Sequence, residues 1–191
     1  DGSRDLTFGY EGRTSAHLSS STSDRTGGEA HVVLADGSIV VSAGTQLIKF
    51  GANGVQDTSA SKFVIATAIH DMISLPGDRL LLAGSVSTRF GATMLNTDRT
   101  LDSTWSADGL APVEFGNSDD IVGRSVQQSN GRIVVASTSL NTFAVTRHLP
   151  TGALDTTFSQ DGKVTIDFGA QYLNAVAADV AIQADGRIVV V

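Results

Sequence analysis

Residues 151–169 read TGALDTTFSQDGKVTIDFG, and this stretch decides the fold because the chain repeats its pattern. An Asp is followed three positions later by an aromatic residue and, after three more, by an acidic-Gly pair: Asp155, Phe158 and Asp161-Gly162. The other copies are Asp5, Phe8 and Glu11-Gly12; Asp102, Trp105 and Asp108-Gly109; and a degraded copy with Asn53-Gly54 and Asp57. Successive aspartates are 52, 45 and 53 residues apart. A period of about 50 residues indicates a tandem array of one supersecondary unit.

A second signal keeps the same period. In each unit a turn that contains glycine precedes an apolar run: Asp36-Gly37 before 39–41, Gly77-Asp78 before 80–82, Asn130-Gly131 before 133–135, and Asp185-Gly186 before 188–190. Asp185-Gly186 is typical of a type I′ hairpin turn, in which both residues have positive φ. The continuous apolar runs indicate strands that are buried on both faces.

Two further stretches complete each unit. Residues 163–168 alternate apolar and polar side chains, and residues 174–183 form an extended stretch before the hairpin. Residues 143–149, with their counterparts 45–50 and 90–95, are predicted to be the exposed outer edges of the units. Four short antiparallel strands per unit make a blade. The sequence therefore predicts an all-β fold, a β-propeller with four-stranded antiparallel blades of about 50 residues.

The repeats divide the chain into four units, 1–56, 57–101, 102–154 and 155–191, and the last is incomplete. Closed propellers have about four to eight blades, so we expect a partial ring. The chain opens inside a repeat motif and stops within a strand, and we expect it to be a piece of a longer or processed protein. Further blades, a strand from the N-terminal side, or association of two chains would complete the ring. An open array would expose an apolar blade face, which favours association, so closure by a homo-oligomer or by a partner is expected unless further blades complete the ring.

The repeated Asp and aromatic residues are predicted to join consecutive blades. Each Asp accepts hydrogen bonds from backbone N–H groups two or three residues on, which fixes a turn. The aromatic ring then inserts between blades, where its burial contributes about 1.5–3 kcal/mol. These junction residues are Asp5, Phe8, Asp102, Trp105, Asp155 and Phe158. The second junction has Ala60 in the aromatic position and lacks the acidic-Gly pair, so it is predicted to be the loosest.

The segments 154–158, 161–169 and 183–190 resemble the delta-60 repeat, which is found in bacterial, often secreted, multi-repeat proteins. The resemblance covers essentially the whole chain, strongly in the third and fourth units and weakly in the second. It implies propeller blades, an extracellular or cell-surface location, and a binding or scaffolding role. The family has no shared catalytic signature, so the resemblance implies no activity.

Composition excludes several functions. A net charge of -7 and the lack of a basic stripe argue against a nucleic-acid partner. No apolar run approaches the roughly 20 residues of a membrane-spanning helix, so membrane insertion is not expected. The chain has no cysteine, which excludes disulfides and thiolate metal sites. The polar residues 117–120 lack the spaced acidic ligands of a calcium loop, so no metal and no cofactor is predicted.

Motifs for catalysis are absent: there is no Gly-x-Ser-x-Gly elbow, phosphate-binding P-loop, His-Glu-x-x-His or EF-hand pattern. His70 and Asp71 are adjacent, and a carboxylate can orient an imidazole. However, neighbouring residues on a strand point to opposite faces, so the pair should not share a site. Catalysis is therefore not favoured by the sequence.

The candidate binding residues lie where the repeats disagree. Aligned on the hairpins, the strand before each hairpin varies among acidic, basic, imidazole and small side chains. The candidates are Glu29, His31, His70, Asp71, Arg124 and Asp179. If this strand lies near the propeller axis, they ring the mouth of the channel, where a rigid scaffold presents binding residues.

Two functions stay open. The first is a non-catalytic structural or interaction module that binds a protein or a glycan. The alternative is a propeller hydrolase, lyase or small-ligand binder with its site at the channel mouth. Arg124 is the only arginine in the variable stretch, which argues against a sialidase-like arginine cluster.

Overall fold

The computed structural model describes residues 2–16, 28–43, 46–59, 63–64, 69–86, 89–115, 121–139, 142–169 and 175–191, and the regular elements within them are all strands. The first sheet contains β1 (Gly28–Val33), β2 (Ile39–Ala43), β3 (Gln46–Phe50) and β4 (Phe63–Val64). The second contains β5 (Ile69–Leu75), β6 (Arg79–Val86), β7 (Arg89–Leu95) and β8 (Leu110–Val113). The third contains β9 (Ile121–Gln127), β10 (Ile133–Ser139), β11 (Thr142–His148) and β12 (Lys163–Ile166), and β13 (Val180–Ile182) pairs with β14 (Ile188–Val190).

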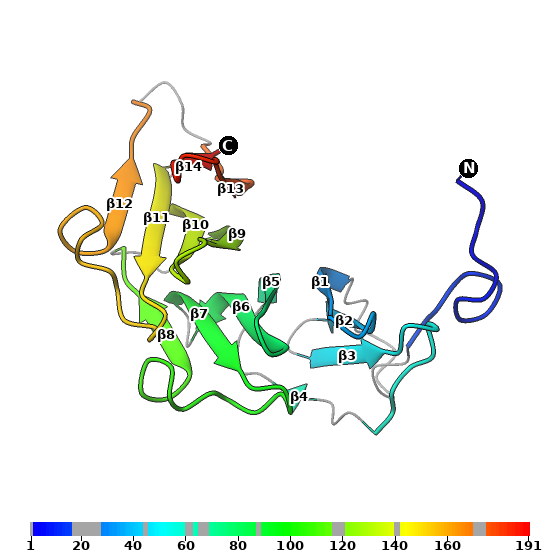
Figure 1. Cartoon of the computed structure of the whole chain (residues 1–191). Coiled ribbons are helices and arrows are strands. Elements are labelled where there is room, and N and C mark those ends of the chain that lie inside the picture. Colours follow the sequence, from blue (N-terminus) through cyan, green and yellow to red (C-terminus); the bar gives the residue numbers. More distant parts are fainter. Residues whose placement is uncertain are drawn as a thin grey trace.

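The sheets are blades arranged in an arc. Strands within each sheet follow the chain order, and each pairs antiparallel with the next. Figure 1 shows β1, β5, β9 and β13 along the concave side of the arc, with β4, β8 and β12 on the outer side. The all-β class and the four-stranded antiparallel blades are confirmed, and the fold is of the β-propeller type. We call the sheets β1–β4, β5–β8 and β9–β12 the first, second and third blades. The described part of the chain contains no helix that is long and apolar enough to cross a membrane.

The blades are offset from the sequence units by one strand. The acidic-Gly turns at Asp108-Gly109 and Asp161-Gly162 send the chain back along the strand that precedes the motif. Thus β12 pairs with β11, and the Arg147 N–H donates to Gly162 O at 2.9 Å; β8 pairs with β7 in the same way. The prediction that residues 45–50, 90–95 and 143–149 form exposed outer edges is therefore wrong. β7 is buried at every position except Arg89, because β8 covers its far side.

The hairpin turn at Asp185-Gly186 differs from the predicted type I′. Gly186 has a φ of +85°, whereas Asp185 is not among the residues with positive φ. The Gly186 N–H donates to Gln183 O at 2.9 Å, and the Gln183 N–H donates to Arg187 O at 2.8 Å. This is a type I turn followed by a left-handed glycine. Asp185 instead accepts a hydrogen bond from the Arg187 N–H at 3.1 Å, so its side chain closes the loop without the strain of a positive φ.

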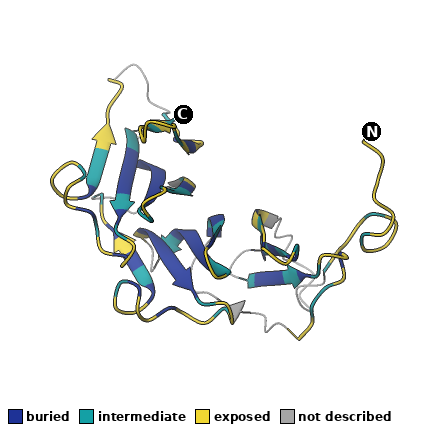
Figure 2. Cartoon of the chain, viewed as in Figure 1, coloured by how far each residue is buried: buried dark blue, intermediate teal, exposed yellow. Residues whose placement is uncertain are grey.

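A hydrophobic core lies between each pair of consecutive blades. Leu47 of the first blade shares a core with Leu82 of the second, and Leu81 of the second shares one with Val135 of the third. Val134 of the third blade packs with Val180 of the β13–β14 pair. Figure 2 shows the buried residues concentrated in the central strands of the second and third blades. The arc is therefore held together by blade-on-blade packing.

The motif aromatics pack against the backbone of the next blade. Trp105 is 1% exposed, and a Cβ atom added to Gly152 of the third blade would lie 2.8 Å from its ring. Beside this contact the Ser106 N–H donates to Thr151 O at 2.7 Å. Phe8 repeats the arrangement at Gly54 of the first blade, where an added Cβ atom would lie 3.0 Å from its ring.

The motif aspartates tie the loop to its own blade. Asp155 Oδ1 accepts hydrogen bonds from the Thr157 hydroxyl at 2.6 Å and the Thr157 N–H at 3.1 Å. Its Oδ2 accepts from Arg132 Nε at 2.7 Å and Arg147 Nε at 2.8 Å. The Thr157 hydroxyl, followed by the backbone and the arginines, holds the pKa of Asp155 well below its usual range. Asp102 repeats the pattern with Thr104 and Arg79.

Replacing Trp105 with Ala should lower the free energy of unfolding by about 3–5 kcal/mol, because it empties a fully buried site between two blades. Urea-induced unfolding measures the change. Leu101→Ala is the control, since Leu101 is an exposed residue of the same loop. A loss below about 1 kcal/mol for Trp105→Ala would contradict the packing role, since large-to-small changes in a core cost more than this.

Asp155→Ala should reduce the sensitivity of the fold to acid. A carboxylate with a lowered pKa in the folded state stabilises that state above the unfolded pKa, about 4. The contribution is lost as the pH falls below that value. Between pH 6 and pH 2 the Tm of the wild type should therefore fall several degrees further than that of Asp155→Ala.

The matched control for this pH series is Asp161→Ala. Asp161 is exposed and accepts the Lys163 N–H at 2.9 Å in the same loop. Its variant should follow the wild-type slope more closely than Asp155→Ala does. Parallel Tm curves for Asp155→Ala and the wild type would show that the Asp155 carboxylate does not stabilise the blade.

Candidate functional site

The inner strands of the three complete blades each carry a β-bulge at the same level. On β5 the extra residue between Ile69 and Asp71 is His70, and on β9 the extra residue is Gly123. On β1 the shift falls between Gly28 and His31, a segment that includes Glu29. A bulge bends its strand and re-aims the neighbouring side chains. The positions at which the repeats differ most are thus the positions where the inner strands leave regular pairing.

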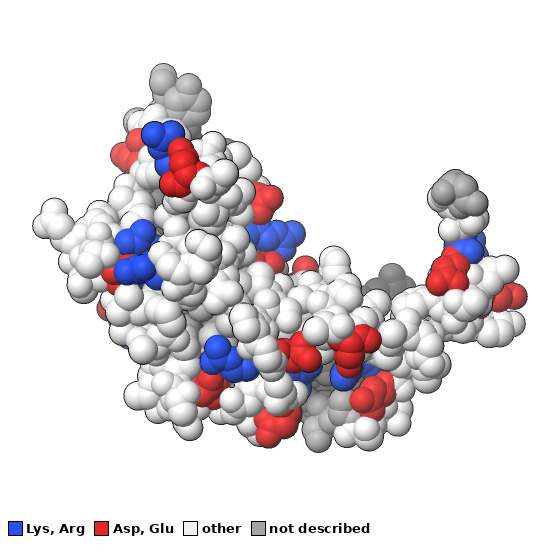
Figure 3. Space-filling model, viewed as in Figure 1, with Lys and Arg blue, Asp and Glu red and all other residues white. Residues whose placement is uncertain are grey.

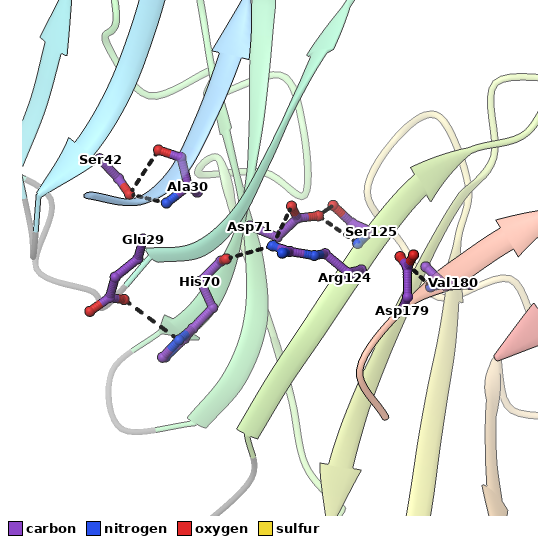
Figure 4. Close-up of polar contacts among 9 residues, drawn as sticks. All are labelled: Glu29, Ala30, Ser42, His70, Asp71, Arg124, Ser125, Asp179 and Val180. Carbon is purple, nitrogen blue, oxygen red and sulfur yellow. Dashed lines mark hydrogen bonds and ion pairs between the residues drawn. The ribbon is translucent and has the colours of Figure 1, made fainter. Parts of the chain in front are cut away.

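A chain of polar contacts joins the blades at this level (Figure 4). Glu29 Oε2 lies 3.7 Å from His70 Nδ1, which links the first blade to the second. Arg124 of the third blade donates from Nη1 to His70 O at 3.4 Å and to Asp71 Oδ1 at 3.4 Å. Asp71 Oδ2 accepts from both the N–H and the hydroxyl of Ser125, each at 2.6 Å. We call Glu29, His70, Asp71, Arg124 and Ser125 the inner-edge cluster.

Two members of the inner-edge cluster form a buried tie. Asp71 and Ser125 are each 8% exposed, and both hydrogen bonds between them are short. Hydrogen bonds to an ionised carboxylate are stronger than neutral ones, and this pair bridges β5 and β9. The carboxylate of Asp71 is therefore engaged in holding two blades together.

The other members present polar groups to solvent. The side chains of Glu29, His70 and Arg124 are 49%, 36% and 46% exposed, so each is accessible to a partner. His70 reaches toward the first blade, whereas Asp71 reaches toward the third. As a result, the adjacent His and Asp do not face the same neighbour.

The structure does not bring all the predicted residues together. Asp179 Oδ1 accepts the N–H of the next residue, Val180, at 2.8 Å. His31 pairs with Val41 across β1 and β2 and is exposed. Residues 117–120 lie outside the described residues. The sequence did not point to Ser125. Its partner on the neighbouring blade is Asp71, which aligns with Arg124, one position earlier, when the repeats are superimposed.

The inner-edge cluster is suited to binding by hydrogen bonds and charge. Within the described residues no group of three or more His, Asp or Glu side chains is placed to hold a metal ion. The exposed carboxylate, imidazole and guanidinium groups offer both donors and acceptors. They belong to the inner strands β1, β5 and β9, which line the concave side of the arc in Figure 1, and a rigid scaffold of this kind fixes the positions of its side chains.

Comparison with known proteins supports the fold. No family model matches the sequence, and no curated protein matches it. A streptogramin B lyase structure is similar with a TM-score of 0.59 and 12% identity over 88% of this chain and 49% of that one. A protein of unknown function from Bacteroides caccae gives 0.58 and 12%, over 87% and 53%. A catalytically inactive virginiamycin B lyase from Staphylococcus aureus, with quinupristin, gives 0.58 and 10%, over 88% and 50%.

The chain spans about half the length of these similar structures. The TM-scores of 0.58–0.59 show a shared fold, and at identities of 10–12% they show nothing about function. They agree with the propeller-type arrangement of the blades. The more specific delta-60 resemblance stays a prediction.

Asp71→Ala should lower the free energy of unfolding by about 1–3 kcal/mol, because it leaves the buried Ser125 N–H and hydroxyl without their acceptor. Arg124→Ala should cost less than about 1 kcal/mol, since its ion pair with Asp71 is long and half-exposed. Urea unfolding of the two variants measures the difference. Equal losses would mean that the ion pair, and not the Ser125 contact, joins the blades.

Proposed function

We propose that this chain is a non-catalytic β-propeller interaction module that binds a protein or a glycan through the inner-edge cluster. One observation carries the proposal. The buried Asp71–Ser125 pair fixes the inner strands, and the side chains of Glu29, His70 and Arg124 remain exposed around it. A rigid frame with accessible donors and acceptors of both charges suits recognition of peptide or sugar groups.

Charge narrows the partner class. Acidic and basic side chains are interspersed over the face in Figure 3, and the chain carries a net charge of -7. Nucleic-acid binding requires a basic surface that neutralises phosphates, so proteins and glycans fit better. The resemblance to the delta-60 repeat supports a secreted or surface-associated location in bacteria.

The alternative, a hydrolase or lyase with its site at the channel mouth, has less support. Acid–base catalysis requires a group that is within reach of substrate and free to exchange a proton. Asp71 is buried and hydrogen-bonded to Ser125, so its carboxylate is not within reach of a substrate. Resemblance to lyase structures at 10–12% identity adds no support for this alternative.

The test is binding of the purified chain to an array of bacterial surface glycans and secreted proteins, followed by affinity measurement for each hit. Replacing Glu29, His70 and Arg124 together with Ala should weaken binding at least tenfold, because it removes the accessible groups. It leaves the Asp71–Ser125 tie intact. Circular dichroism should show an unchanged fold.

The matched control is the double variant Arg89→Ala, Glu114→Ala. These residues form an exposed ion pair at 2.7 Å on the outer side of the second blade, away from the inner strands. This variant should bind like the wild type. If the triple variant binds the array ligands as tightly as the wild type, the binding site lies elsewhere. Turnover of a bound glycan would refute the non-catalytic assignment.

A further inference from the structure

Among the described residues, His148 is the only buried histidine, and it lies at the junction of the second and third blades. It is the last residue of β11 and is 1% exposed. Its imidazole faces the ring of Trp105, with 6.2 Å between the two ring centroids. The inner-edge cluster belongs to the first strands of the blades, whereas β11 is a third strand, so His148 is not part of that cluster.

Two hydrogen bonds determine which ring nitrogen of His148 carries the proton. Nδ1 lies 3.0 Å from Gly152 O, and Nε2 lies 3.2 Å from the Thr146 hydroxyl oxygen. A carbonyl oxygen can only accept, so Nδ1 carries a hydrogen, and Nε2 of the neutral ring accepts from the hydroxyl. Gly152 is also the residue against which the ring of Trp105 packs. Neutral His148 therefore holds the turn that contacts Trp105.

The other two blades have apolar side chains at the position of His148. Strand pairing places Leu95 of the second blade and Phe50 of the first blade there, and both are buried. Thr93 of the second blade likewise occupies the position of Thr146. A leucine is thus compatible with this position beside the same threonine, so the fold does not require an imidazole. The histidine is particular to the junction of the second and third blades.

The charged side chains on the elements around His148 pair with one another. Arg132 of β10 and Arg147 of β11 both bind Asp155, and Arg79 of β6 binds Asp102 in the Trp105 loop. The remaining charged side chains nearby are Asp108, which accepts the Leu110 N–H, Lys163, which lies near Asp161 and Glu114 O, and Glu114, which pairs with Arg89. The turn 149–154 has no ionisable side chain. None of the described carboxylates forms an ion pair with the imidazole.

A second proton on the ring is therefore unfavourable while the junction is closed. An imidazolium has two N–H donors, and its charge would be buried without a counter-ion. The Thr146 hydroxyl is fully buried and would have to turn its hydrogen away from Nε2. Burial accordingly lowers the pKa of His148 below its ordinary value, and the hydrogen bond to Gly152 O offsets only part of this effect. The charged ring is more stable in water than in the junction.

We propose that proton uptake by His148 opens the junction between the second and third blades, so that the ring of Trp105 leaves Gly152. A proton from solvent adds to Nε2, and the imidazolium moves toward water. The turn 149–154 can move with it, because Pro150, Thr151 and Ala153 are exposed. The pairing of β11 with β10 and β12 does not have to break. The junction is thus closed in neutral solution and opens in acid.

The direction of the pH effect follows from the lowered pKa of His148. In the open form the imidazole is solvated and has a pKa of about 6.5, whereas in the closed form its pKa is lower. The closed form is therefore most stable above about pH 6.5 and loses stability as the pH falls through the pKa of the closed form. Because one proton is taken up, the ratio of closed to open molecules should fall by up to about tenfold for each pH unit. Asp155 acts below about pH 4, so the two effects are separable.

Hydrogen exchange of the whole chain tests the proposal. Trp105 is the only tryptophan, and its indole N–H is buried, so this single resonance reports release of the ring. The Ser106 N–H, which donates to Thr151 O at 2.7 Å across the junction, is a second reporter. Between pH 7.5 and pH 5 the protection of both groups, corrected for intrinsic exchange, should fall about tenfold. The amides of β10 should keep their protection.

His148→Leu is the matched variant, because the second blade has leucine at this position. It should fold like the wild type, as judged by circular dichroism, and protection of the Trp105 indole should stay constant over the same pH range. His148→Asn is the second variant: its amide can donate to Gly152 O and takes up no proton in this range, so its protection should also stay constant. The control His31→Leu removes an exposed histidine of the first blade and should respond like the wild type.

Three results would overturn the proposal. The first is constant protection of the Trp105 indole in the wild type between pH 7.5 and pH 5. The second is a wild-type response in either folded His148 variant. The third is an equal loss of protection in β10, which would mean that the whole blade unfolds. Each outcome is separate from the array test, because no inner-edge residue is altered.

Discussion

The packing of a loop aromatic against a glycine of the following blade is the contact on which the arc depends. Trp105 meets Gly152, and Phe8 meets Gly54, at distances that leave no room for a Cβ atom. In both cases the amide after the aromatic donates to the turn of the next blade. The ring therefore serves two purposes: it fills the space between blades and fixes their relative position. Together with the cores between the blades, this contact sets how the second and third blades lie, since strand pairing acts only within each blade.

A second tie acts at the concave edge, where Asp71 bridges to Ser125. The second and third blades are thus joined near both ends, by the ring of Trp105 outside and the carboxylate of Asp71 inside. This arrangement holds the inner-edge cluster in place and leaves its exposed polar groups accessible to solvent. Glu29, His70 and Arg124 stay 36–49% exposed although they also make contacts between blades. Along β5 and β9 an exposed residue is followed directly by a buried one: His70 by Asp71, and Arg124 by Ser125.

The sequence predicted the blades well because their signals are local. Alternation, glycine turns and apolar runs such as 133–135 mark strands, and β10 is buried throughout. The offset by one strand was not predictable, because a period gives the length of a unit and not the point where one sheet ends. Only the pairing of β12 with β11 settles it. The sequence Asp185-Gly186 likewise fits two turn types. The contact of Ser125 with Asp71 joins non-equivalent positions of two blades, so an alignment of equivalent positions does not reveal it.

Residues that touch across a junction change together, and this explains why one junction differs. Gly152 is needed only while a ring lies on it, so a unit without the aromatic has no such constraint on the facing turn. In the second blade that position is Arg99, and its positive φ shows that the turn kept its shape although the glycine was lost. The backbone frame of the turn therefore persists without the glycine.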